Sequence, residues 1–270
     1  MRSKFQSYKF WSFKFMEPSR RKFIKETILP GMAISCLPTI NSIAASLVNT
    51  SVHNLKNGAV LLFQGDSITD GNRGRNADPN HIMGHGYAFS IASKIGADYP
   101  EKRYQFCNRG ISGNKVNDLE KRWQAETLDL KPDVLSILVG VNDSSSVVLR
   151  REPLLSVEKY GEIYTSLLEQ TKAAFPTILF ILCEPFILQV GRVKENWDAY
   201  HADIVQRQAI VRKLATKHNA VFVGFQEVFD KACEKAPADY WIWDGVHPTV
   251  AGHEIMAREW MKQVEKRIRF

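Results

Sequence analysis

Five short stretches of the chain are predominantly apolar, and longer stretches with apolar residues every three or four positions separate them. The short stretches are residues 59–64, 104–108, 134–139, 178–184 and 220–225. Their valine, isoleucine, leucine and phenylalanine residues do not alternate with polar ones. They therefore predict strands of a parallel sheet that is covered on both faces.

The longer stretches predict helices. They are residues 86–99, a looser segment 116–127, and residues 157–175, 198–218 and 249–269. Thr249 is a suitable N-cap for the last of these. Strands that alternate with helices predict one α/β domain, a three-layer α/β/α sandwich around a five-stranded parallel sheet. We expect the flavodoxin-like strand order 2-1-3-4-5.

The residues that precede this domain differ from it in charge. The chain has 36 lysines and arginines against 29 aspartates and glutamates, a formal net charge of +7. Residues 1–57 contain nine of the basic residues and two of the acidic ones. The rest of the chain is neutral, with 27 residues of each sign. The domain therefore has no charge excess with which to bind a nucleic acid.

The basic segment has the pattern of an export signal. Arg20 and Arg21 precede a moderately apolar stretch, residues 27–48, and this order is typical of a signal read by the twin-arginine export machinery. Pro30, Gly31 and Pro38 interrupt that stretch, which therefore lacks the ~18 consecutive apolar residues of a membrane-spanning helix. We expect an exported protein, periplasmic or secreted.

The predicted organisation is a leader over residues 1–45, a linker over 46–57 and the α/β domain over 58–270. Cleavage after Ala44 or Ala45 would leave a nearly neutral mature chain. Lipid attachment at Cys36 is the second alternative, because the residues before it fit a lipobox poorly. Met16 is an alternative start to Met1. The sequence is compatible with a homo-oligomer.

Three cysteines follow the leader: Cys107, Cys183 and Cys233. No Cys/Cys or Cys/His pair has the spacing of a zinc site, and three cysteines do not form a disulfide framework. Free buried thiols are expected for Cys107 and Cys183, with one disulfide after export as the alternative. No phosphate-binding glycine motif follows any predicted strand, so the sequence predicts neither a metal nor a cofactor.

Polar residues follow the apolar stretches at their carboxyl ends, where open parallel sheets gather functional groups. The first stretch ends in Gly65-Asp66-Ser67. The second leads into a loop that contains Arg109 and Gly113, and the third leads into Gly140-Val141-Asn142-Asp143. In the expected strand order, Ser67 and Asn142 face one crevice, and Gly113 reaches it from the neighbouring strand.

These residue types suit nucleophilic catalysis. A serine hydroxyl needs a base, which His247 can provide, and Asp244 can orient the imidazole from three residues earlier. A tetrahedral oxyanion needs fixed donors, which the backbone N–H groups of Ser67 and Gly113 and the amide of Asn142 can supply.

With these four blocks in this order, the chain resembles the SGNH, or GDSL-type, hydrolases. The resemblance implies that Ser67 is the nucleophile, His247 the base and Asp244 its orienting carboxylate. Gly113 and Asn142 would form the oxyanion hole with the Ser67 N–H. The G-x-S-x-G elbow of α/β-hydrolases is absent, because Thr69 stands in place of the second glycine.

Finer features resemble the bacterial SGNH acetylxylan esterases: the segment 108–114, Trp243 directly before Asp244, and the segment 247–253. This resemblance implies an acetylated carbohydrate as substrate. The aromatic side chains of residues 240–243 suit sugar rings but could equally belong to the core. The alternatives are a lysophospholipase or short-chain lipid esterase of the same family, and a non-catalytic carbohydrate-binding relative.

Three further residues are candidates for substrate binding. They are Trp243, Arg109 and Asp66. A strand-end arginine more often makes an ion pair, and an aspartate in this position more often caps backbone amides around the serine loop. His253 is expected to lie in the last helix with a structural role.

Overall fold

The structure is a computed structural model that describes residues 52–76 and 78–270. The predicted leader, with Arg20, Arg21, Cys36 and the cleavage site, lies outside the described residues. No helix in the described part of the chain is long and apolar enough to cross a bilayer.

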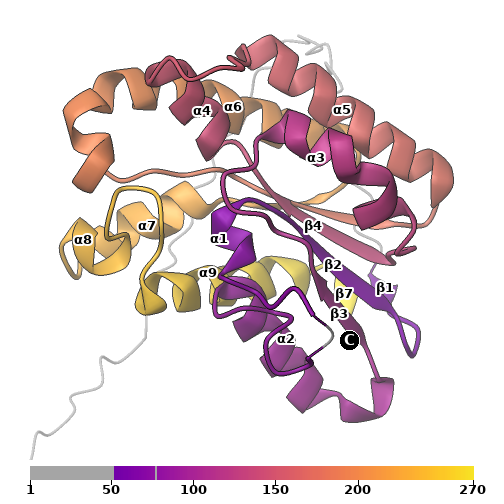
Figure 1. Cartoon of the computed structure of the whole chain (residues 1–270). Coiled ribbons are helices and arrows are strands. Elements are labelled where there is room, and N and C mark those ends of the chain that lie inside the picture. Colours follow the sequence, from indigo (N-terminus) through magenta and orange to yellow (C-terminus); the bar gives the residue numbers. More distant parts are fainter. Residues whose placement is uncertain (1–51, 77) are drawn as a thin grey trace, which may run out of the picture. The chain divides into compact units, whose positions relative to one another are not determined.

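Five parallel strands form the central sheet (Figure 1). They are β2 (Val60–Gly65), β3 (Gln105–Asn108), β4 (Val134–Leu138), β5 (Leu179–Cys183) and β6 (Val221–Val223). Their order is β3-β2-β4-β5-β6, which confirms the predicted 2-1-3-4-5 arrangement. In register, Leu62 of β2 lies opposite Cys107 on one side and Leu135 on the other.

Helices cover both faces of the sheet, because successive side chains of a strand point to opposite sides. Leu61 and Phe63 of β2 pack into one apolar cluster and Leu62 into another. The first cluster is covered by α2 (Tyr87–Asp98), α7 (Phe225–Cys233) and α9 (Val250–Val264). The second is covered by α3 (Val116–Trp123), α5 (Val157–Ala174) and α6 (Trp197–Lys217), which also reaches the first cluster through Tyr200 and Ile204.

Several short elements were not predicted. They are α1 (Ser67–Asp70), α4 (Val141–Val148), α7, α8 (Ala238–Trp241), the 3₁₀ turns Pro100–Lys102 and Gly191–Asn196, and the π-turn Gln124–Leu128. A second sheet pairs β1 (His53–Asn54), inside the expected linker, with β7 (Ile268–Arg269). The expected final helix is therefore too long: it ends at Val264, and the chain turns back to form β7.

Candidate active site

Ser67 is the first residue of α1, directly beyond the carboxyl end of β2. Asp66 is the N-cap of this helix, and its Oδ1 accepts a hydrogen bond from the Ile68 N–H at 3.0 Å. Gly65 is required before it, because a Cβ at that position would lie 2.3 Å from the Leu138 carbonyl oxygen of β4. The turn therefore fixes the Ser67 hydroxyl at the edge of the sheet.

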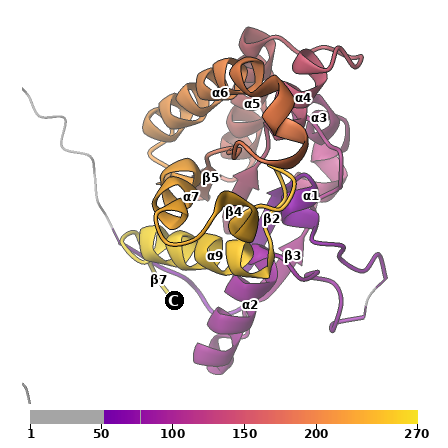
Figure 2. The same ribbon diagram turned by 90° about the vertical axis from the view of Figure 1, so that its left-hand side faces the viewer.

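A chain of hydrogen bonds connects Ser67 to the far end of the sequence. Ser67 Oγ lies 2.8 Å from His247 Nε2, and His247 Nδ1 lies 2.8 Å from Asp244 Oδ2. The other carboxylate oxygen of Asp244 accepts the backbone N–H groups of Val246 at 3.0 Å and His247 at 2.7 Å. The loop between α8 and α9, which carries both residues, thus returns to α1 (Figures 1 and 2).

Asp244 is held in its ionised form. Burial alone would raise its pKa, but the hydrogen bonds from the His247 side chain and from the His247 and Val246 N–H groups lower the pKa to about 2. An ionised carboxylate only accepts hydrogen bonds, so Nδ1 of His247 carries a proton and Nε2 is free to accept one from Ser67. A hydroxyl, an imidazole and a carboxylate in this order can form an activated nucleophile.

Candidate hydrogen-bond donors lie in two neighbouring segments, the loop after β3 and the start of α4. Gly113 has φ +83°, and a Cβ at this position would meet no atom within 4 Å. None of the described residues accepts a hydrogen bond from its N–H. Asn142 lies in the first turn of α4, and its Nδ2 donates to the Asn114 carbonyl at 3.1 Å. These donors can stabilise a negative oxygen.

Arg192 is a site residue that the sequence analysis missed. It lies in the turn after β5, and its Nε is 3.2 Å from Asp244 Oδ2. Its Nη2 lies 3.4 Å from His247 Nδ1. The segment follows the carboxyl end of the fourth predicted strand, which was a signal for this position. No residue type within it distinguished Arg192 from an ordinary surface arginine.

The side chains of residues 240–243, three of which are aromatic, divide between core and surface. Ile242 is buried and Trp241 packs against the core cluster, whereas Tyr240 and Trp243 are exposed. The Trp243 side chain is 64% exposed and lies nearly parallel to the His247 ring, with an interplanar angle of 21° and a centroid distance of 6.4 Å. Trp243 therefore presents a flat apolar face beside the candidate base.

The other two candidate substrate residues have structural contacts. Asp66 is buried as the cap of α1, which places it beneath Ser67 rather than in the crevice. The guanidinium of Arg109 donates to the Asn108 carbonyl at 3.2 Å, and among the described residues it makes no ion pair. His253 is in α9 as expected, where its Nδ1 accepts the Tyr87 N–H at 3.1 Å. Burial, together with nearby His85 and His247, lowers the pKa of His253 to about 4.

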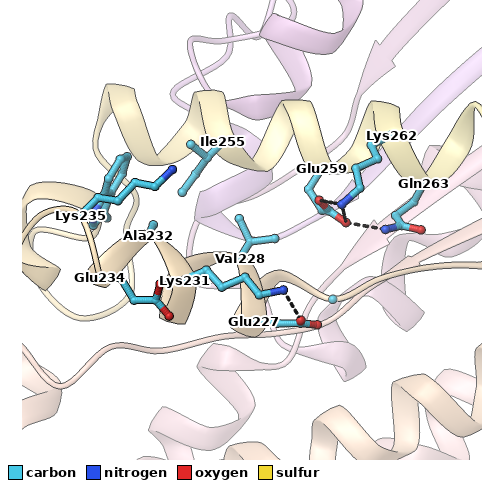
Figure 3. A pocket seen from close by; sticks show the side chains of 12 residues that line it. Glu227, Val228, Lys231, Ala232, Glu234, Lys235, Ile255, Glu259, Lys262 and Gln263 are labelled. Atoms are coloured by element: carbon cyan, nitrogen blue, oxygen red, sulfur yellow. Dashed lines mark hydrogen bonds and ion pairs between the residues drawn. The ribbon is translucent and has the colours of Figure 1, made fainter. Parts of the chain in front are cut away.

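A groove of about 570 Å³ lies between α7 and α9, and Ser67, Asp244 and His247 do not line it (Figure 3). Two of its lysines pair with glutamates: Lys231 with Glu227, and Lys262 with Glu259. The three cysteines of the described part are free thiols. Within that part, no cluster of three or more histidine, cysteine or acidic side chains could hold a metal ion.

The sequence of the chain is similar to those of known ester hydrolases. The GDSL-like Lipase/Acylhydrolase family matches residues 63–255. The chain is 33% identical over 212 residues to an acetylxylan esterase from Geobacillus stearothermophilus, and the match covers 77% of this chain and 94% of the relative.

Solved structures give the same assignment. A protein from Parabacteroides merdae assigned as a GDSL-like lipase superimposes with a TM-score of 0.76 at 39% identity, covering 80% of this chain and 100% of that one. A variant of an acetylxylan esterase from G. stearothermophilus superimposes with a TM-score of 0.70 at 32% identity, covering 80% and 99% of the two chains. The chain therefore belongs to the GDSL-like lipase/acylhydrolase family and is a carboxylic ester hydrolase with the SGNH hydrolase fold.

Proposed function

We propose that the protein is a serine esterase that removes acetyl groups from a carbohydrate, acetylxylan or a related acetylated glycan. The observation that carries the proposal is the unbroken chain of hydrogen bonds from Ser67 through His247 to Asp244, with Gly113 and Asn142 as the expected oxyanion donors.

The reaction proceeds through an acyl-enzyme. Ser67 Oγ attacks the ester carbonyl while His247 Nε2 takes its proton, and the oxyanion is held by the N–H groups of Ser67 and Gly113 and by the Asn142 amide. His247 returns the proton to the sugar oxygen, which leaves as the alcohol. Water then attacks the acetyl-enzyme, assisted by the same base, and acetate is released as Ser67 is restored.

Two features of the chain support a glycan substrate. The exposed face of Trp243 beside His247 suits the apolar face of a sugar ring. The domain from residue 58 onward is neutral, which suits an uncharged polymer better than a polyanion. The acetylxylan esterase among its relatives, at 33% identity, points to the same substrate class.

Replacement of the nucleophile tests the mechanism. Ser67→Ala should reduce turnover of a small aryl acetate by a factor on the order of 10⁴–10⁶ without loss of the fold. Ser166→Ala, in α5, is the matched control and should keep full turnover. Turnover of the aryl acetate by Ser67→Ala at the wild-type rate would disprove the proposal.

A substrate panel tests the specificity. The panel compares acetate release from acetylated oligomers of xylan, pectin, sialoglycan and chitin. We expect release to be greatest from acetylated xylan or a related polymer. The rate of hydrolysis of aryl esters should fall steeply when the acyl chain is longer than four carbons. Equal or faster hydrolysis of longer chains would favour the lipid-esterase alternative, and sugar binding without hydrolysis of any ester would favour a binding protein.

We also propose that the protein is exported through its twin-arginine leader. Arg20→Lys together with Arg21→Lys should retain the precursor in the cytoplasm. N-terminal sequencing of the exported wild type should give a start at Ala45 or Ser46. A mature chain that begins at a lipid-modified Cys36 would instead support the lipid-anchored alternative.

A further inference from the structure

Asp70 lies three residues after Ser67, at the end of α1, and its side chain is only 3% exposed. Its Oδ2 accepts both the backbone N–H of Ser112, at 3.0 Å, and the Ser112 hydroxyl, at 3.2 Å. Its Oδ1 accepts the Arg73 N–H at 3.1 Å. Asp70 therefore connects the helix that begins at Ser67 to the loop that follows β3.

Asp70 is charged at neutral pH. Partial burial would raise its pKa, but the Arg75 guanidinium and the N–H groups of Ser112 and Arg73 lower the pKa below its usual range. Hydrogen bonds from a backbone N–H to an ionised carboxylate are shorter and stronger than neutral ones. The Ser112 N–H is thus held by a strong acceptor inside the protein.

The contacts of Ser112 determine the direction of the next N–H group. The Ser112 N–H is bound to Asp70, and the Asn114 N–H closes a turn onto the Ile111 carbonyl at 3.1 Å. Between them, no described residue accepts the Gly113 N–H. The Ser112–Gly113 peptide is the central peptide of this turn, and φ +83° at Gly113 is the value of a type II turn, which sets the direction of the Gly113 N–H.

We propose that Asp70 is a positioning residue of the oxyanion hole, which holds the Ser112–Gly113 segment so that the Gly113 N–H points at the oxygen of the ester carbonyl whose carbon Ser67 attacks. The proposal rests on the proposed function, in which Gly113 supplies an oxyanion donor. Asp70 couples the nucleophile and this donor directly, because it lies on the same helical turn as Ser67.

A purely structural role would act through the ion pair with Arg75. Arg75 Nη2 lies 2.7 Å from Asp70 Oδ2, and the Arg75 side chain is 53% exposed. The pair is bidentate, since Arg75 Nη1 also lies 3.0 Å from Asp70 Oδ1, and solvent screens it on the arginine side. Arg75→Gln removes that pair and leaves the Asp70–Ser112 hydrogen bonds in place, so it is a matched control.

The test compares Asp70→Leu, Asp70→Asn and Arg75→Gln with an aryl acetate as substrate. Loss of one oxyanion donor reduces turnover by about 10²–10³, so Asp70→Leu, which misplaces one, should lower kcat by about 10–100-fold with KM nearly unchanged. Asp70→Asn keeps an acceptor for the Ser112 N–H and should recover part of the loss. Arg75→Gln should remain within about threefold of wild type.

A tetrahedral inhibitor separates positioning from general damage. A boronic acid forms a tetrahedral adduct with Ser67, and in each Asp70 variant its affinity should fall by the same factor as kcat. The affinity for acetate, which is not tetrahedral, should stay unchanged. If Asp70→Leu fails to fold, Asp70→Asn and the inhibitor series decide the result. Wild-type kcat in the Asp70 variants, or an equal loss in Arg75→Gln, would overturn the proposal. The proposed function fails separately, if Ser67→Ala remains active.

Discussion

Arg192 and Asp244 are joined at two points. The Nε of Arg192 lies 3.2 Å from Asp244 Oδ2, and the backbone N–H of Arg192 donates to the Asp244 carbonyl at 3.1 Å. Oδ2 is the same oxygen that lies 2.8 Å from His247 Nδ1. The carboxylate thus has a histidine on one side and a guanidinium on the other, and the turn after β5 is attached directly to the loop that carries the base.

Arg192→Gln should lower kcat/KM modestly. The side chain is 51% exposed, and pairs of this kind contribute about 0.2–1 kcal/mol, which corresponds to a loss of about 1.5–5-fold. Steady-state kinetics on an aryl acetate at low salt measures the effect. Lys194→Gln, an exposed change of the same charge in the same turn, should have no effect. Equal losses in both variants would mean that overall charge, not the contact with Asp244, is responsible.

Gly191→Ala should reduce both stability and activity. Gly191 has φ +53°, and an added Cβ would lie 2.5 Å from the Asp244 Cα, so the loop of the base must shift. Gly58→Ala is the matched control, because Gly58 has φ +71° but open space around it. The backbone strain alone, which both variants share, should lower the free energy of unfolding by about 1–2 kcal/mol. Gly191→Ala should lower it by about 1–3 kcal/mol more than Gly58→Ala does, and should also lower kcat. Urea unfolding and kinetics check this, and similar results for the two variants would contradict it.

Asp66→Asn should remove a pH dependence of stability. Burial, which outweighs the Ile68 N–H hydrogen bond, raises the pKa of Asp66 to about 7 from the 3.8 of an exposed aspartate. A raised pKa means that the folded state holds the proton more tightly. The contribution of Asp66 to the free energy of unfolding is therefore complete below pH 4 and declines as the pH rises to about 7.

The asparagine variant should thus gain stability relative to wild type between pH 4.5 and pH 8, by on the order of 2–4 kcal/mol. Its side-chain oxygen can still cap the Ile68 N–H. Urea unfolding at several pH values measures the difference. Asp129→Asn, at an exposed position, serves as the control. A difference between Asp66→Asn and wild type that does not change with pH would show that Asp66 is not protonated in the folded protein.

Trp243→Ala should raise KM for an acetylated xylo-oligosaccharide by about 5–30-fold, since an aromatic platform contributes roughly 1–2 kcal/mol to sugar binding. KM for a small aryl acetate should change much less, because that substrate has no sugar ring to rest on the indole. Trp243→Phe should restore part of the affinity for the oligosaccharide. Parallel losses on both substrates would indicate that Trp243 acts on His247, against which it lies, and not on the glycan.

The sequence predicted the sheet well because its strands are buried on both faces. Continuous apolar stretches such as residues 134–139 mark such strands directly, and their alternation with helical stretches leaves few arrangements of a parallel sheet. The short elements escaped prediction for a physical reason. The helix that begins at Ser67 has four residues and is defined by its Asp66 cap, and β1 and β7 are formed by two residues each. Tertiary contacts rather than periodicity decide such elements.

The candidate site was predictable where chemistry needs a particular residue type. Ser67, Asp244 and His247 are such residues, and the structure brings their side chains together. Asp70 and Arg192 act through hydrogen bonds to other residues, which a carboxylate or guanidinium on any polar loop could make. Only the folded arrangement shows that Asp70 reaches Ser112 and that Arg192 reaches Asp244.

Ser67 and His247 are 180 positions apart in the chain, and each half of the reactive pair comes from a different end of the domain. A division of the chain in the exposed stretch 150–154 would give one fragment with the serine and both oxyanion donors and a second with the base and its carboxylate. Neither fragment could hydrolyse an ester at the wild-type rate. If each fragment were fused to one of two proteins that bind each other, acetate release would report that binding.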